Sequence, residues 1–157
     1  MKKLNDNDLF LCRYLSDLFE YATLKNECCP HCFYRAYIHS SVRKRMCSRN
    51  FINESLDIPA AYEIIKKESS FYVNLDGSNY PSYVMAWIGY IFKYMSIALS
   101  IPEITLYKSL KISDLYNQYE SYHSLDNDLV VERLVESNKI NTNRNDLKLL
   151  KKIYNIM

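Results

Sequence analysis

The sequence predicts an all-α fold: a compact single-domain bundle of about seven or eight helices around a central buried helix at about residues 82–99. The chain of 157 residues has only two glycines and four prolines, which is unlike sheet proteins with many tight turns. Hydrophobic residues make up 48% of the chain, enough for one core. We expect residues 1–137 to form the helical domain, and residues 138–157 a linker and a basic amphipathic C-terminal helix that packs on it or extends from it.

The first half of the chain contains apolar residues at the three- and four-residue spacing of helices. We expect Asp6 or Asn7 to cap the first helix. Pro30 suits the first turn of the second helix, which should run to about Met46, and Pro59 suits the start of the fourth. The elements expected here are at 11–22, 30–46, 50–56 and 59–68.

The second half begins with a polar segment at 69–81, which we expect to be a loop because a lone strand there would have no partner. Ser100 followed by Glu103 matches a capping box, which predicts a new helix directly after the central one. Ser113 and Asp126 are the expected caps of the next two. The helices expected here are at 82–99, 102–110, 113–122 and 126–137.

The stretch from Tyr80 to Asp126 holds eight of the 15 tyrosines and the single tryptophan. Steps of four, three and four residues place four of its aromatic residues on one helical face. We interpret that face as a buried spine and His123 with Asp126 as a structural joint to the next helix, because a lone histidine beside a cap more often bonds to backbone than catalyses. The aromatic stripe is Tyr83, Trp87, Tyr90 and Tyr94.

Five cysteines include the segment Cys29-Pro30-His31-Cys32, which matches the motif of disulfide oxidases. The segment before it is helical and charged where that fold needs a buried strand, so we do not expect redox catalysis. Cys29, Cys32 and Cys47 could ligate zinc, but there is no second close pair. We expect reduced thiols, no metal and no cofactor.

A second cluster is basic and contains no acid between Cys28 and Asn53. It could bind nucleic acid, phosphate or an acidic protein surface, or it could be a solvated helix end whose charges complement the helix dipole. Binding of nucleic acid through it should weaken steeply with salt. Its members are Arg35, Arg43, Lys44, Arg45 and Arg49.

The residues from Ser100 to His123 read as helix, short turn and helix, which invites comparison with a DNA-binding helix-turn-helix. The second helix is acidic and has no Arg or Lys to contact DNA, so we expect a protein-binding face instead. Its candidate partner-binding residues are Asp114, Asn117, Gln118, Tyr119, Glu120 and Tyr122.

The net charge of +2 says little about partners. The chain starts Met1-Lys2-Lys3-Leu4 without the apolar run of a signal peptide, and no window is apolar enough for a membrane span. We therefore expect a cytoplasmic protein.

Two short motifs in the tyrosine-rich stretch resemble a mostly uncharacterised family of small bacterial helical proteins associated with Firmicutes and their mobile elements. The motifs are Trp87-Ile88-Gly89-Tyr90 followed by Tyr94, and Leu115-Tyr116 with Tyr119, Tyr122-His123 and Asp126. The resemblance covers about residues 30–137. It does not extend to the cysteine cluster at 28–32 or to the basic tail from Lys139.

Proteins of this family look antitoxin-like or toxin-associated, so the resemblance implies binding to a protein partner such as a toxin encoded nearby, and no enzymatic activity. The alternative is a nucleic-acid-binding regulator that uses the basic segment at 35–49.

Overall fold

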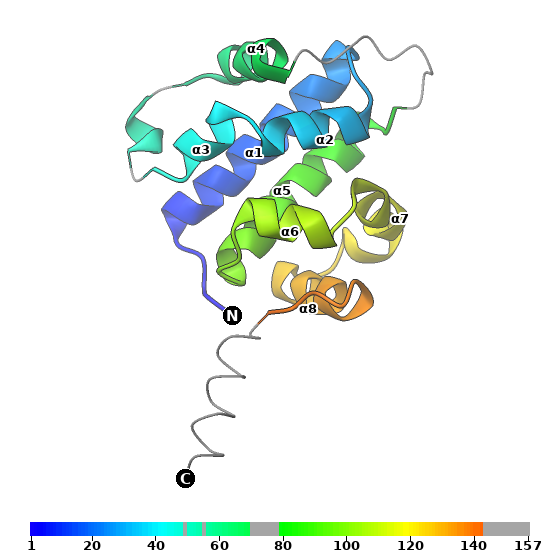
Figure 1. The fold of residues 1–157 in the computed structure, drawn as a ribbon. Coiled ribbons are helices and arrows are strands. Elements are labelled where there is room, and N and C mark those ends of the chain that lie inside the picture. The colour runs from blue at the N-terminus through cyan, green and yellow to red at the C-terminus, as the bar shows by residue number, and fades with distance from the viewer. Residues whose placement is uncertain (49, 55, 70–78, 143–157) are drawn as a thin grey trace.

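The computed structural model describes residues 1–48, 50–54, 56–69 and 79–142 (Figure 1). Those residues form only helices and their connections, which confirms the predicted all-α bundle. Most of the predicted loop at 69–81 and the predicted C-terminal helix lie outside the described residues. The helices are α1 (Asp6–Lys25), α2 (Pro30–Ile38), α3 (Ser41–Met46), a 3-10 helix η1 (Phe51–Glu54), α4 (Ile58–Ser69), α5 (Ser82–Ala98), α6 (Glu103–Ser109), α7 (Ile112–Tyr122) and α8 (Asn127–Ser137).

The antiparallel pair of α1 and α5 forms the centre of the bundle (Figure 1). The pair is tied at both ends, because the Lys2 N–H donates to the Ala98 carbonyl over 2.7 Å and the Asn79 amide donates to the Thr23 carbonyl over 3.3 Å. Between these ties, Gly89 faces α1 so closely that a Cβ built there would lie 2.6 Å from the Leu15 carbonyl oxygen. Only glycine permits this approach of the two backbones.

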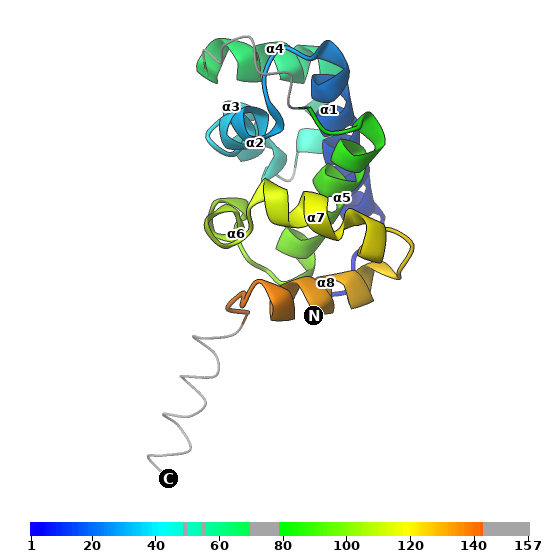
Figure 2. The ribbon, with the colours of Figure 1, turned by 90° about the vertical axis from the view of Figure 1, so that its right-hand side faces the viewer.

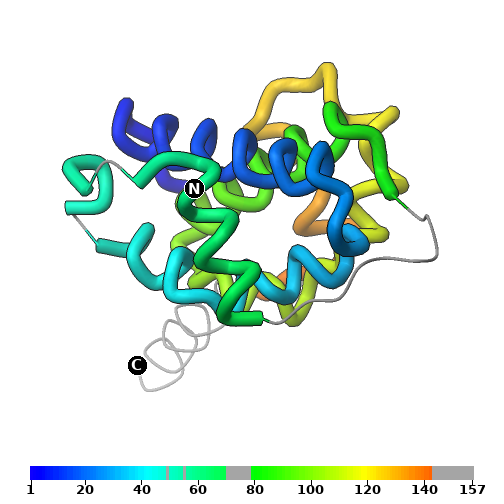
Figure 3. The backbone as a smooth tube through the Cα atoms, turned by 90° about the horizontal axis from the view of Figure 1, so that it is seen from above, coloured from blue at the N-terminus to red at the C-terminus, as the bar shows by residue number. Residues whose placement is uncertain are grey.

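The remaining helices surround this pair. The helix α4 lies across α1, α2 and α3 at one end of the molecule, as the view from above shows (Figure 3). The helix α8 closes the opposite end, and α7 lies against α5 on one side (Figure 2). Among the described residues no single helix is long and apolar enough to cross a membrane; α5 and α6 meet that criterion only as a pair bent by 115°.

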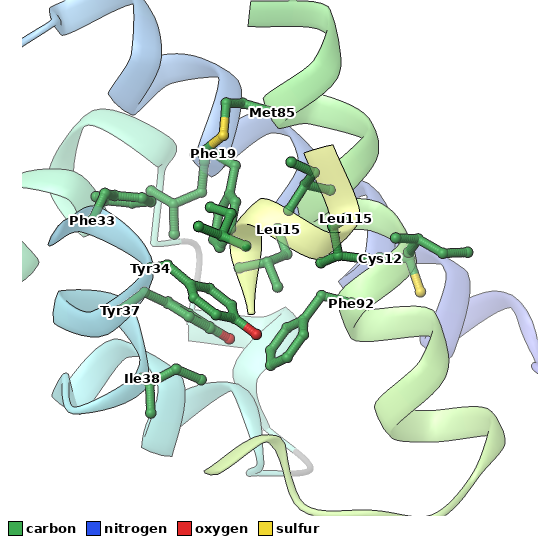
Figure 4. Packing of buried hydrophobic residues seen from close by; sticks show 14 of the residues in the cluster. Cys12, Leu15, Phe19, Phe33, Tyr34, Tyr37, Ile38, Met85, Phe92 and Leu115 are labelled. Atoms are coloured by element: carbon green, nitrogen blue, oxygen red, sulfur yellow. The ribbon is translucent and has the colours of Figure 1, made fainter. Parts of the chain in front are cut away.

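Aromatic rings from α1 and α2 fill the core (Figure 4). The Phe19 ring meets the Phe33 and Tyr37 rings edge to face, with centroids 5.2 Å and 5.7 Å apart. Tyr34 packs against Phe92 of α5 in the same way at 5.2 Å, and its hydroxyl donates to the Leu110 carbonyl over 2.9 Å. Buried tyrosine therefore provides both apolar area and a polar link to a distant segment.

A buried ion pair joins three helices at the base of this core. The Lys93 ammonium of α5 lies 3.3 Å from the Glu103 carboxylate of α6, and both side chains are at most 5% exposed. The Tyr37 hydroxyl of α2 donates to the same carboxylate oxygen over 2.8 Å. Burial, followed by the Glu103 charge, raises the pKa of Tyr37 well above its usual value. The second carboxylate oxygen of Glu103 has no hydrogen-bond partner within the described residues.

Several predicted helix ends were wrong. Ser100 has a φ of 54° and follows the last turn of α5, and Glu103 is drawn into the ion pair, so the two do not form a capping box. Lys111, not Ser113, precedes α7. Asn5, with Asp8, forms the capping box of α1 in place of Asp6 or Asn7.

The predicted helix from Pro30 to Met46 is two helices, because the Ser40 hydroxyl accepts a hydrogen bond from the Arg43 N–H and starts α3. Asp126 does precede α8, although without a side-chain hydrogen bond. Pro59 is one residue inside α4, whose first turn is capped by Asp57 through the Ala60 N–H at 2.8 Å.

The predicted buried spine was also wrong in part. Tyr94 is buried and donates to Asp128 over 2.6 Å, but Trp87 and Tyr90 are half-buried and Tyr83 is 60% exposed. Gly89 is the residue of α5 that meets the α1 backbone, and the neighbouring Ile88 and Phe92 are fully buried. The aromatic stripe lies beside that buried side, and it is only partly covered.

Replacing Gly89 by alanine should destabilise the protein by about 1–3 kcal/mol, because the added methyl group meets the rigid Leu15 backbone. The same substitution in an ordinary helix interior stabilises by about 1 kcal/mol, so the sign of the change is diagnostic. Chemical denaturation followed by circular dichroism measures it. A stabilised Gly89→Ala variant would disprove the close contact of α1 and α5.

Replacing Lys93 by methionine should cost about 3–5 kcal/mol, because it leaves Glu103 buried without a counter-charge. The double variant Lys93→Met with Glu103→Gln should recover most of that loss, since a neutral amide oxygen still accepts from Tyr37. A double-mutant cycle of unfolding free energies measures the coupling. Additive single effects would show that the two groups do not interact.

Candidate functional site

An exposed group of aromatic residues joins α5 and α7. The Tyr80 and Tyr116 rings are stacked with centroids 4.0 Å apart and an interplanar angle of 15°. The Tyr119 ring lies 5.7 Å from Tyr83 and 5.5 Å from Trp87. The His123 ring stacks on Tyr119 at 4.4 Å. We define the aromatic surface as Tyr80, Tyr83, Trp87, Tyr116, Tyr119 and His123.

The aromatic surface exists because α7 covers α5 incompletely. Ile112 and Leu115 are the fully buried residues of α7, so only one narrow side of this helix enters the core. The following aromatic positions of α7 lie at the boundary with solvent. Tyr83 is 60% exposed and Tyr116 40% exposed, while Trp87 and Tyr119 are half-buried between them. Rings held in mutual contact at a solvent boundary are already ordered for binding.

His123 belongs to this surface and not to an acid–base pair. Its Nδ1 lies 2.8 Å from the Tyr119 carbonyl oxygen, so its hydrogen bond is made within its own helix. Asp126 is exposed at the start of α8 and shares no hydrogen bond or ion pair with His123 within the described part of the chain. The turn that leaves α7 is closed by backbone, since the Leu125 N–H donates to the Tyr122 carbonyl over 3.0 Å.

The six candidate partner-binding residues lie in different surroundings. Asn117 and Glu120 are exposed, and Asp114 is half-buried. Gln118 turns toward α8, where its amide donates to the Ser137 hydroxyl over 3.2 Å. Tyr122 lines a shallow hollow with α8 residues such as Leu129 and Arg133. Tyr119 is the member that joins the aromatic surface.

Some of the positive charge in the basic segment at 35–49 is already engaged by other groups of the protein. Arg45 lies 3.1 Å from Glu54, and the Arg43 guanidinium donates to the Ile38 carbonyl. Glu68 of α4 accepts the Ser41 N–H over 2.8 Å and brings a negative charge to the start of α3; hydrogen bonds from Ser41 lower the pKa of this carboxyl. Arg35 and Lys44 are exposed, and Arg49 lies outside the described residues. Acids distant in sequence therefore neutralise part of this field.

The cysteines fall into three surroundings. Cys29 and Cys32 stand at the start of α2 with their sulfur atoms 2.6 Å apart. Cys12 and Cys28 are buried, and Cys47 is exposed at the end of α3. Within the residues that the structure describes, no group of three or more His, Cys, Asp or Glu side chains could hold a metal ion. The described residues thus do not bring Cys29, Cys32 and Cys47 together as a ligand set.

Comparisons of this chain with protein-family models, with curated proteins and with solved structures gave no match.

Sequence reasoning missed that Tyr80 and Tyr83 are surface partners of α7. A signal was present, since Tyr80, Tyr83 and Trp87 repeat at steps of three and four residues, and Tyr116, Tyr119 and His123 repeat at the same steps. Steps of three and four residues place each set on one side of its segment, which marks the two sets as candidates to meet.

Tyr119 is the centre of the aromatic surface, so replacing it by alanine should destabilise the fold by about 1–3 kcal/mol. The fluorescence of Trp87, the single tryptophan, should also shift to longer wavelength as the indole gains contact with water. The control is Glu120→Ala at the exposed neighbouring position, which should change neither quantity. Unchanged emission from Tyr119→Ala would contradict the contact with Trp87.

Proposed function

We propose that this chain is a protein-binding module, an antitoxin-like neutraliser of a toxin encoded nearby, and that the aromatic surface with the exposed polar residues of α7 is its contact face. The observation that carries the proposal is the set of contacts that partly exposed rings of α7 make with rings at and just before the start of α5. The resemblance of the Trp87–Tyr90 and Tyr122–Asp126 motifs to antitoxin-like proteins suggests the kind of partner.

Exposed tyrosine and tryptophan support binding to protein because they supply large contact area at a low cost in side-chain entropy. Here that cost is further reduced, since the Tyr80 and Tyr116 rings already restrain each other at 4.0 Å. Tyr83 and Tyr116 project furthest from the fold, and so they are the expected anchors. Trp87 and Tyr119 between them form the floor on which a partner side chain would rest.

The charge around this floor indicates the chemistry of the partner. The helix α7 carries Asp114 and Glu120 and contains neither Lys nor Arg. Two exposed tyrosine faces beside carboxylates fit an arginine, whose guanidinium both stacks on a ring and pairs with an acid. We therefore expect a partner with a basic, arginine-containing contact surface.

The test measures two things: the growth of cells that express the protein encoded by the neighbouring reading frame, and the binding of that protein to this chain. Expression of that neighbour alone should inhibit growth, and co-expression of this chain should restore it and give a stoichiometric complex. Tyr83→Ala and Tyr116→Ala should each weaken the complex by about 2 kcal/mol, roughly 30-fold, while the chain stays folded. The matched control is Ile52→Ala, which should bind normally. Ile52 is also an exposed apolar residue, and its helix η1 lies on the opposite side of the bundle from α7 (Figure 1).

Two results would contradict the proposal. One is that the protein encoded by the neighbouring reading frame does not inhibit growth and that this chain is repeatedly purified without a bound partner. The other is a complex that Tyr83→Ala and Tyr116→Ala leave intact, which would place the contact face elsewhere. A complex with nucleic acid that weakens steeply with salt and depends on Arg35 and Lys44 would favour the regulator instead.

A further inference from the structure

The segment Cys29-Pro30-His31-Cys32 brings two sulfur atoms together at the surface. The Cys29 and Cys32 Sγ atoms are 2.6 Å apart, close to the disulfide bond length of about 2.05 Å. Cys32 is exposed and Cys29 is half-buried, so small reagents can reach the pair. The proposed contact face does not use either thiol.

The helix start holds the Cys29 sulfur in a fixed position. Cys29 is the cap residue of the nine-residue α2, and its sulfur accepts the Cys32 backbone N–H over 3.2 Å. The adjacent Pro30 occupies the first position of α2 and fixes the backbone between the two cysteines. The hydrogen bond between the two sulfur atoms, followed by burial, raises the pKa of Cys32, so Cys29 is the expected attacking thiol of the pair.

The other cysteines lack this combination. Burial raises the pKa of Cys12 and of Cys28 to about 12, which makes both unreactive near neutral pH. Cys47 is exposed, and its thiol contacts the Arg43 carbonyl at 3.5 Å instead of a second sulfur. Cys47 therefore serves as an internal control, because it is exposed as Cys32 is but has no neighbouring thiol among the described residues.

We propose that Cys29 and Cys32 form a redox-active dithiol site that low-molecular-weight disulfides oxidise reversibly to an intramolecular disulfide. The Cys29 thiolate attacks one sulfur of the reagent, forms a mixed disulfide and releases one thiolate. Cys32 then loses its proton and attacks the Cys29 sulfur, which forms the protein disulfide and releases the second thiolate. The protein loses two electrons and two protons, and the reagent disulfide becomes two thiols.

The fold around the pair differs from that of the disulfide oxidases that share this motif, because the surrounding residues are helical and the described part of the chain has no strand. The pair also lies near the contact face, since the charge of Cys29 is among the factors, after burial and Tyr116, that raise the pKa of Tyr80.

The experiment treats the reduced full-length chain with oxidised glutathione and follows intact mass and proteolytic peptides. The wild-type chain should lose two hydrogens, and one peptide should contain a Cys29–Cys32 bond that dithiothreitol reverses. Cys32→Ser should instead accumulate one glutathione adduct on Cys29, formed about ten-fold faster than any adduct on Cys47. Cys29→Ser should fold normally, because serine is a good helix cap, and should lose this fast reaction.

Cys28→Ser and Cys47→Ser are the controls and should still form the disulfide. A bond that disappears in Cys28→Ser but survives in Cys29→Ser would overturn the assignment. So would adducts that form on Cys29 and Cys47 of Cys32→Ser at equal rates, or a wild-type pair that remains reduced in excess oxidised glutathione. None of these measurements involves a protein partner, so they are independent of the proposed contact face.

Discussion

The close approach of α1 and α5 at Gly89 is the constraint on which the rest of this structure depends. Because a Cβ at Gly89 would lie only 2.6 Å from the Leu15 carbonyl oxygen, the two helices pack backbone to backbone. This places Phe19 deep enough to meet Phe33 and Tyr37, and it leaves one side of α5 facing away from α1. The short helix α7 covers that side only in part, and the aromatic surface is the consequence.

Much of the fold followed from sequence periodicity. The spacing of apolar residues located α1, α4 and α8, because each buries one continuous stripe, and it located α5, which is buried over most of its circumference. The starts of α6 and α7 could not be predicted in the same way. Ser100 and Glu103 have the spacing of a capping box, yet Lys93, ten residues earlier in the chain, binds the Glu103 carboxylate in the core. The Ser100–Glu103 spacing therefore did not produce a capping box, because Glu103 binds Lys93 in the tertiary structure, and no local sequence pattern reveals that contact.

The candidate site was less predictable than the fold. Periodicity correctly put Tyr83, Trp87 and Tyr90 on one side of a helix, but it could not say which neighbour covers that side. Coverage depends on the position of α7, and so the difference between a buried spine and an exposed contact face is a tertiary property. The basic segment shows the same limit, since Glu54 and Glu68 reach it from other elements.

The long sequence separation of the central contacts also has a consequence for synthesis of the chain. The Tyr34 hydroxyl bonds to a carbonyl 76 residues later, and α1 gains its main partner only when α5 has been made. Until then α1 can pack only against earlier helices such as α2 and α4, and the side that meets α5 stays uncovered. Loop closure over such distances slows folding relative to bundles of sequential hairpins. Chaperones that shield nascent chains would therefore be most useful to this protein before α5 emerges.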